Sequence, residues 1–109
     1  MERRVGSRAQ VDLPVGAYVD GWWHPCRAVD LSSRGMVVQR TKSLSGRSIS
    51  QLNELALELG GRIIGVLART VWHDGRMLAV RFVDMSDVDR LEIAEHLDEI
   101  ARRRRQLLH

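Results

Sequence analysis

The chain has 109 residues and a mass of 12.4 kDa, a length typical of one domain, which excludes an enzyme with separate substrate and cofactor domains. Hydrophobic residues make up 44% of the chain and charged residues 28%, which excludes a wholly disordered protein because such chains lack the apolar side chains of a core. The formal net charge is +3, and its excess lies in residues 1–47, where eight Lys or Arg face four Asp or Glu, so we expect this half to attract phosphate groups.

The N-terminal segment 1–12 is predicted to be a flexible basic arm. It contains Arg3, Arg4 and Arg8 together with a Gly-Ser pair, and it has few apolar side chains to bury. No apolar stretch follows the first charged residues as in a secretory leader, and no run in the chain approaches the roughly 20 apolar residues that span a bilayer. We therefore expect a cytoplasmic protein that does not insert into membranes.

Residues 13–84 are predicted to form an antiparallel β-barrel. Six segments have the alternation or the β-branched composition of strands: 15–19, 23–29, 36–39, 52–59, 62–72 and 77–83. Pro25 cannot donate a ladder hydrogen bond, so it should lie at an edge or a bulge. Residues 41–50 are rich in Ser and Thr and predict a loop, and residues 73–75 predict a hairpin turn.

Residues 86–108 are predicted to form one long helix, because their apolar residues recur at helical spacing. Ser86 or Asp87 is predicted to cap its N-terminus. Acidic residues dominate the first half of this segment and Arg102–Arg105 follow near its end, an order that suits the helix dipole. A contact of these arginines with DNA or a membrane is the alternative. The expected fold class is mainly β, a single domain over 1–109 that consists of a small six-stranded antiparallel barrel with a long C-terminal α-helix.

The sequence contains no recognisable pattern of catalytic or metal-binding residues. Cys26 is a lone cysteine, so it cannot form an internal disulfide and is expected to be a small buried residue. The histidines lie in no triad-like setting, and His24 and Cys26 lack a second pair of ligands at metal-binding spacing. A Gly-rich phosphate loop is also missing. We therefore expect a protein that is not an enzyme and that holds no metal or cofactor.

Two short motifs stand about 22 residues apart in the first third of the chain. The first is Arg-x-x-x-Arg, preceded by one more arginine, and the second is Asp-x-Ser-x-x-Gly at the end of a predicted strand. Their residues are Arg3, Arg4 and Arg8, then Asp30, Ser32 and Gly35. In this order, and followed by further strands and a terminal helix, the motifs resemble the PilZ domain, the bacterial receptor module for cyclic di-GMP. The resemblance extends over nearly the whole chain.

The chemistry of these residues suits a guanine nucleotide. Guanine presents O6 and N7 as acceptors that a guanidinium fork can bind with two hydrogen bonds, and the same fork pairs with phosphate oxygens. The N1 and N2 hydrogens of guanine need an acceptor such as the Asp30 carboxylate, and Ser32 can bind base or phosphate. Gly35 allows a tight turn and a close approach of backbone to ligand. The alternative for Asp30 and Ser32 is an ordinary Asx or Ser turn.

The resemblance implies a role for each motif and for several neighbours. The two arginines of the first motif would clamp guanine and phosphate from the arm, and the second motif would form the matching surface on the barrel. Arg3 directly precedes the first motif arginine, and an arginine at this position resembles the family members that bind two mutually intercalated ligands. Trp72 is the candidate aromatic neighbour of a guanine, with a core or barrel-end tryptophan as the alternative, and Arg34 could add a cation. A second Asp-x-Ser, at Asp84 and Ser86, lacks the glycine and is interpreted as a helix cap.

The sequence therefore predicts a cyclic di-GMP receptor or adaptor that binds the dinucleotide as an intercalated pair and signals to a macromolecular partner of unknown identity. One alternative is a basic DNA-binding protein that uses the arm and Arg102–Arg105 on phosphates, but no helix-turn-helix or ribbon motif supports base recognition. The other alternative is a degenerate PilZ-like scaffold that binds only protein. The intact Arg4, Arg8, Asp30 and Ser32 argue against it.

Overall fold

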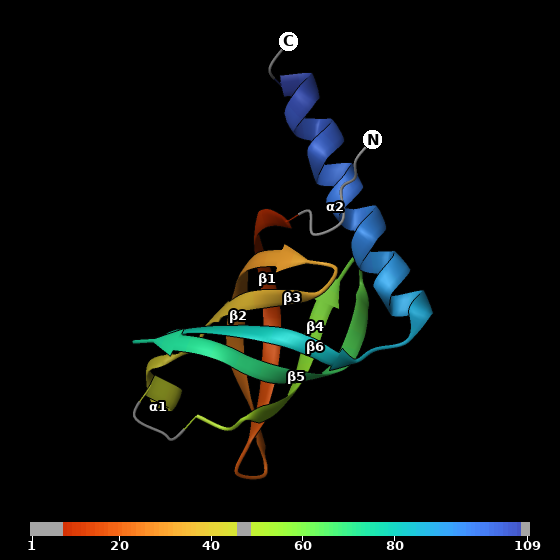
Figure 1. Ribbon diagram of the computed structural model, residues 1–109. Coiled ribbons are helices and arrows are strands. Elements are labelled where there is room, and N and C mark those ends of the chain that lie inside the picture. The colour runs from red at the N-terminus through yellow and green to blue at the C-terminus, as the bar shows by residue number, and fades with distance from the viewer. Residues whose placement is uncertain (1–7, 46–48, 108–109) are drawn as a thin grey trace.

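A computed structural model describes residues 8–45 and 49–107. Six antiparallel strands close into a barrel in the order β1-β2-β3-β6-β5-β4, as Figure 1 shows. Their bounds are β1 Arg8–Val19, β2 Trp22–Ser32, β3 Gly35–Gln39, β4 Leu52–Leu59, β5 Arg62–Asp74 and β6 Met77–Asp84. A short helix α1 (Lys42–Ser45) follows β3, and the long helix α2 (Asp87–Leu107) ends the described chain. The predicted fold class is confirmed.

The strands follow from the alternation of apolar side chains. In β4, Leu55, Leu57 and Leu59 are buried while Glu58 between them is exposed. Leucine and glutamate favour helices when considered singly, but a period of two places every leucine on one face of a strand, and burial of that face decides the structure. The same alternation in β1, β5 and β6 fills the barrel with one apolar core.

Helix α2 lies against β1 and β2 and extends beyond the barrel at its C-terminal end (Figure 1). Ile93 and Leu97 are its buried side chains, and the partly buried Ile100 also packs against the core, so these residues attach the helix to the barrel. Ser86 caps its N-terminus as predicted, because the backbone N–H of Asp89 donates to Ser86 Oγ at 3.1 Å. In the described part of the chain, neither helix has the length and hydropathy to cross a membrane.

The N-terminal boundary of the barrel differs from the prediction. The sequence pattern assigns residues 8–12 to the arm, but β1 begins at Arg8, and Ala9 and Gln10 already pair with β2. Ala9 is buried, and Val11 and Leu13 pack against the core. Polar neighbours and a register shift between Gln10 and Leu13 interrupt the alternation, which is why the sequence pattern suggests too few apolar residues for a strand. Arg3 and Arg4 lie outside the described residues.

Smaller differences concern the connections between strands. The predicted loop 41–50 contains helix α1, and the hairpin between β5 and β6 turns at Gly75 and Arg76, with Asp74 still paired to Met77. Gly75 adopts a positive φ of 59° there, as expected for a two-residue hairpin loop. Strand β2 extends past Val29 to Ser32, so the second motif begins on a strand and turns only after Ser32.

Candidate functional site

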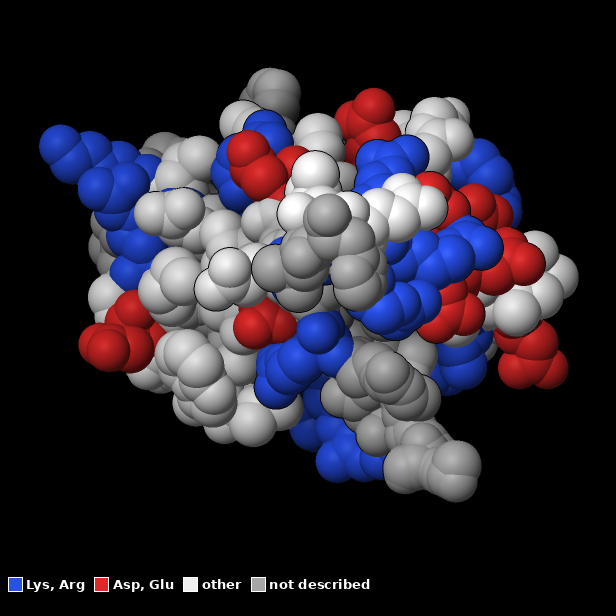
Figure 2. Space-filling model, turned by 90° about the horizontal axis from the view of Figure 1, so that it is seen from above, with Lys and Arg blue, Asp and Glu red and all other residues white. Residues whose placement is uncertain are grey.

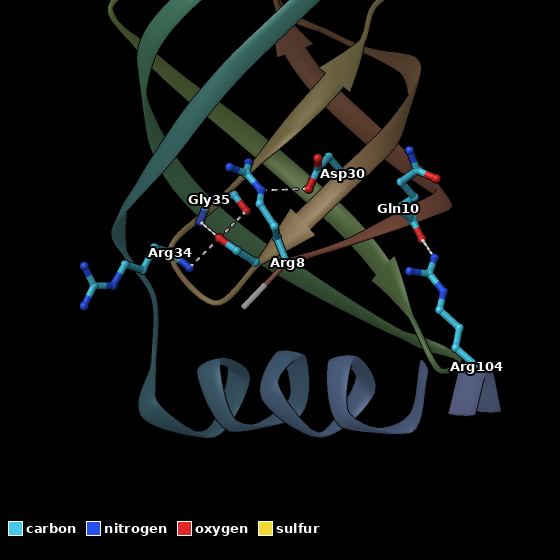
Figure 3. Close-up of polar contacts among 7 residues, drawn as sticks. Arg8, Gln10, Asp30, Arg34, Gly35 and Arg104 are labelled. Carbon is cyan, nitrogen blue, oxygen red and sulfur yellow. Dashed lines mark hydrogen bonds and ion pairs between the residues drawn. The ribbon is translucent and has the colours of Figure 1, made fainter. Parts of the chain in front are cut away.

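The structure brings the two motifs into direct contact. Arg8 lies opposite Ser32 and Gln10 lies opposite Asp30 on the paired strands β1 and β2, so Arg8 and Asp30 are diagonal neighbours on one face of the sheet. Arg8 Nε donates to Asp30 Oδ1 at 3.0 Å, a contact drawn in Figure 3. The Arg8 side chain is 58% exposed and that of Asp30 31%, so solvent and a ligand can reach both groups.

Ser32 holds the turn between β2 and β3. Its Oγ accepts hydrogen bonds from the backbone N–H groups of Arg34 and Gly35, both at 3.1 Å, and donates to the Gly35 carbonyl at 3.2 Å. A hydroxyl has one hydrogen to donate and two lone pairs to accept with, so these three bonds use its whole capacity. Ser32 is also buried. Ser32 thus forms a Ser turn, which is the alternative to a direct ligand contact that the sequence also allows.

Gly35 is required by the close approach of two strands. It lies opposite Arg81 where β3 pairs with β6, and a Cβ at this position would lie 2.2 Å from the Val80 carbonyl oxygen. Any side chain would therefore force the strands apart. The structural reason for the glycine is thus contact with β6, and the expected close approach of backbone to ligand is not needed to explain it.

The turn is also held from outside the motif. The backbone N–H of Phe82 on β6 donates to the Arg34 carbonyl at 2.8 Å, and Arg90 on α2 donates from Nη1 to the Ser33 carbonyl at 3.1 Å. The Arg34 side chain points away from Arg8 in Figure 3. These contacts tie the position of the turn to both the barrel and the helix, so a rigid surface faces the exposed Arg8.

A cavity of about 360 Å³ lies beside this turn. Its lining comprises side chains from β1, β3, β5, β6 and the turn: Arg8, Ser32, Arg34, Gly35, Met36, Val71, Trp72, Ala79, Val80 and Arg81. The cavity thus unites five of the predicted site residues, and Asp30 joins them through its contact with Arg8. Trp72 is 48% exposed, which excludes a core tryptophan and leaves the barrel-end tryptophan as the alternative to a ligand contact.

Arg81 is a cavity residue that neither sequence motif indicates. It is exposed between the buried Val80 and Phe82, so it points outward from β6, as the alternation of a strand requires. That alternation is visible in the sequence. Its position beside Gly35 and the turn depends on how β3 and β6 pair, which the sequence pattern does not reveal.

Two larger cavities lie elsewhere. One of about 830 Å³ is lined by segments 14–16, 23–27 and 39–41 with a few further residues, and it contains none of the predicted site residues. The other, of about 690 Å³, lies between β1 and α2 and shares Arg8 with the cavity beside the turn. Size alone would favour the first of these. The convergence of both motifs favours the smaller cavity beside the turn as the ligand site.

The arginine run of α2 has structural partners. Arg102 and Arg103 form ion pairs with Glu99, and Arg104 Nη2 donates to the Gln10 carbonyl at 3.4 Å. The two arginines beside Glu99 hold its pKa below the ordinary value, Arg102 mainly through its charge. Figure 2 shows basic side chains on this face of the molecule with acidic ones between them. The structure therefore supports the intramolecular explanation of the run.

The remaining candidates show no metal or nucleophile chemistry. Within residues 8–45 and 49–107, no three His, Cys, Asp or Glu side chains lie close enough together to hold a metal ion. Cys26 is buried in the core as predicted, and burial raises the pKa of its thiol, which makes it a poor nucleophile. His24 Nε2 lies 3.2 Å from the Val19 carbonyl.

Comparisons with known proteins identify the family and the fold. The family model of the PilZ domain matches residues 2–99. The inhibitor of motility MotI/DgrA from Bacillus subtilis has a similar structure, with a TM-score of 0.74 and 18% identity over 98% of this chain and 53% of that one, so this chain spans about half of its length. The PilZ domain of CeSA from a cellulose-synthesizing bacterium aligns with a TM-score of 0.63 and 15% identity, covering 87% of this chain and 98% of that one.

An uncharacterized Legionella protein, Lpg0364, has a TM-score of 0.56 and 17% identity, covering 94% of this chain and 99% of that chain. A search of curated protein sequences finds no match. At these identities the solved structures show a shared fold, and the family follows from the model match over nearly the whole chain. The chain therefore belongs to the PilZ domain family, a family of regulatory cyclic di-GMP receptor domains that are not enzymes.

Proposed function

We propose that this protein is a cyclic di-GMP receptor whose ligand binds in the cavity beside the Ser32–Gly35 turn and whose bound state is recognised by a macromolecular partner. The observation that carries the proposal is the contact of Arg8 with Asp30 beside that cavity. It places a guanidinium donor and a carboxylate acceptor, the two groups that match the opposite edges of guanine, within one hydrogen bond of each other.

Each accessible group has a distinct task in this proposal. The Arg8 fork binds guanine O6 and N7 or a phosphate oxygen, and Asp30 accepts from guanine N1 and N2. The exposed face of Trp72 provides a surface on which a base can stack. Ser32 and Gly35 act through the backbone, because they fix the turn that forms one wall of the cavity.

The Arg8–Asp30 ion pair is easily opened by a ligand. Ion pairs between exposed groups contribute about 0–1 kcal/mol, whereas a good bidentate contact to a base contributes about 1–3 kcal/mol. The pair therefore holds both side chains in position without competing strongly with the ligand. Arg4 is proposed as the second arginine that clamps the ligand, and Arg3 as the residue that favours binding of an intercalated pair of ligands. Both residues lie outside the described part of the chain.

Calorimetric titration with cyclic di-GMP and with GTP tests the proposal. Arg8→Ala and Asp30→Ala should each lose about 1–3 kcal/mol of binding free energy. The ion pair between Arg27 and Asp12 is a matched control, because it also joins β1 to β2 at an exposed position but lies away from the cavity. Arg27→Ala and Asp12→Ala should bind as the wild type does. Equal losses in both pairs, or no heat with wild-type protein, would contradict the proposal.

A further inference from the structure

Two arginines lie directly opposite each other on the outer face of the barrel. Arg69 on β5 pairs with Arg81 on β6, and both are exposed while their neighbours Ala68, Val80 and Phe82 are buried. Both side chains therefore point outward from the same face. Directly opposed residues have Cβ atoms roughly 5 Å apart, and like charges in this arrangement repel each other.

No acidic side chain of the described residues neutralises this pair. Five described arginines form ion pairs with carboxylates: Arg8, Arg27, Arg62, Arg102 and Arg103. Arg69 and Arg81 do not, and their next neighbours across the sheet are Leu52 on β4 and Gly35 on β3. The row that crosses these four strands thus carries two positive charges and no negative one. An anion bound between the guanidinium groups would remove their repulsion and gain charge-assisted hydrogen bonds.

The pair continues the candidate ligand site. Arg81 lines the cavity beside the turn together with Arg8 and Trp72. Its neighbour Gly35 has no side chain, so no group on β3 separates the Arg81 side chain from the turn. Arg69 lies one strand farther from the turn. An anion held by both arginines would therefore lie next to a ligand bound at Arg8 and farther from the motif.

We propose that Arg69 and Arg81 form an anion clamp that binds a phosphodiester group of a second cyclic di-GMP molecule. This inference rests on the proposed function. One ligand carries two phosphates and two guanines, and the groups of the two motifs match one guanine and its adjacent phosphate. A second intercalated ligand brings two more phosphates, and the unneutralised pair supplies the positive charge for them. The number of ligands bound per chain then depends on Arg81.

Calorimetry on the full chain tests the clamp. Wild-type protein should bind two cyclic di-GMP molecules per chain. Arg81→Gln should reduce this ratio toward one, and Arg69→Gln should weaken the second step. Arg76→Gln is the matched control, because Arg76 is also exposed on the β5–β6 hairpin but lies at its turn, and this variant should keep two ligands.

A second measurement uses inorganic pyrophosphate and does not depend on cyclic di-GMP. Without an anion, Arg81→Gln should melt at the same temperature as the wild type or higher, because one of two repelling charges is gone. Pyrophosphate should then raise the melting temperature of the wild type and of Arg76→Gln more than that of Arg81→Gln. Equal stabilisation of all three proteins would overturn the clamp.

The outcomes separate the two proposals. Absence of heat when wild-type protein is titrated with cyclic di-GMP would overturn the proposed function. A wild-type ratio of one ligand, or an Arg81→Gln variant that still binds two ligands with wild-type affinity, would overturn the clamp and leave the receptor proposal standing. Far-UV circular dichroism of each variant verifies that a changed ratio does not arise from unfolding.

Discussion

Arg8 and Asp30 are 22 residues apart in the sequence, and the antiparallel pairing of β1 with β2 brings Arg8 Nε to 3.0 Å from Asp30 Oδ1. The contact explains why the two motifs belong to one site. The first motif ends at the start of β1 and the second begins near the end of β2, so the hairpin between them aligns a donor from one with an acceptor from the other. The proposed binding of a guanine nucleotide uses both groups.

Gly35→Ala is expected to destabilise the barrel and distort the site. The added methyl group would meet the Val80 carbonyl at 2.2 Å, and overpacking of this kind costs about 1–3 kcal/mol or more. Gly65→Ala on β5 is the matched control, because no atom lies within 4 Å of its Cβ position. Urea denaturation should show a loss for Gly35→Ala and little change for Gly65→Ala. Equal stability of the two variants would show that the strands can separate at Gly35 without cost.

Ser32→Ala is expected to reduce stability and, through the turn, affinity. The substitution leaves the buried Gly35 N–H and the partly buried Arg34 N–H without their acceptor, and each buried group left unsatisfied costs about 1–3 kcal/mol. Ser33→Ala is the control, because Arg90 donates to the Ser33 carbonyl, which alanine retains. Thermal melts and cyclic di-GMP titrations of both variants test this. A stable Ser32→Ala protein with reduced affinity would instead indicate a direct contact between Ser32 and the ligand.

Trp72→Ala is expected to weaken cyclic di-GMP binding by about 1–3 kcal/mol, the contribution of stacking an aromatic side chain on a base. Trp22, 72% exposed at the start of β2, is not in the lining of the ligand cavity and provides the control. Ligand should quench the fluorescence of Trp22→Phe but have a much smaller effect on Trp72→Phe. Quenching that persists without Trp72 would place the bases elsewhere.

The ion pairs of Glu99 predict a pH dependence of helix stability. Arg102 and Arg103 lower its pKa below the ordinary value of 4.5, so the folded protein binds this proton less readily than the unfolded chain does. The resulting stabilisation is present above the unfolded pKa and is lost as pH falls through the lower, folded pKa. The difference in melting temperature between the wild type and Glu99→Gln should therefore shrink between pH 7 and pH 3. A constant difference would show that the ion pairs do not contribute.

The sequence predicts the parts of this protein that depend on local pattern. The alternation around Leu57 and the helical spacing around Leu97 decide between strand and helix because each reflects the face that becomes buried. The start of β1 does not follow from such a pattern, because Ala9 is a small apolar residue between two polar ones. Its burial results from pairing with Leu31, which is 22 residues later in the chain.

The candidate site shows the same division. Asp30 and Arg8 are recognisable from the spacing of the motifs, and the hydrogen-bonding chemistry of their side chains suits the guanine nucleotide that the family resemblance implies. The position of Arg81 beside Gly35, and opposite Arg69, depends on the register of β6 with β3, which is distant in the sequence, and with its hairpin partner β5. A short motif does not contain that register, so the second half of the cavity becomes visible only in the folded barrel.

An amide chemical-shift titration of the full chain tests whether cyclic di-GMP binds in the cavity beside the Ser32–Gly35 turn. Added ligand should shift the backbone signals of Arg8, of residues 30–36, of Val71 and Trp72, and of residues 79–81. Signals of residues 23–27, which line the larger cavity, should stay unchanged. Shifts confined to residues 23–27, or no shifts at millimolar ligand, would contradict binding in this cavity.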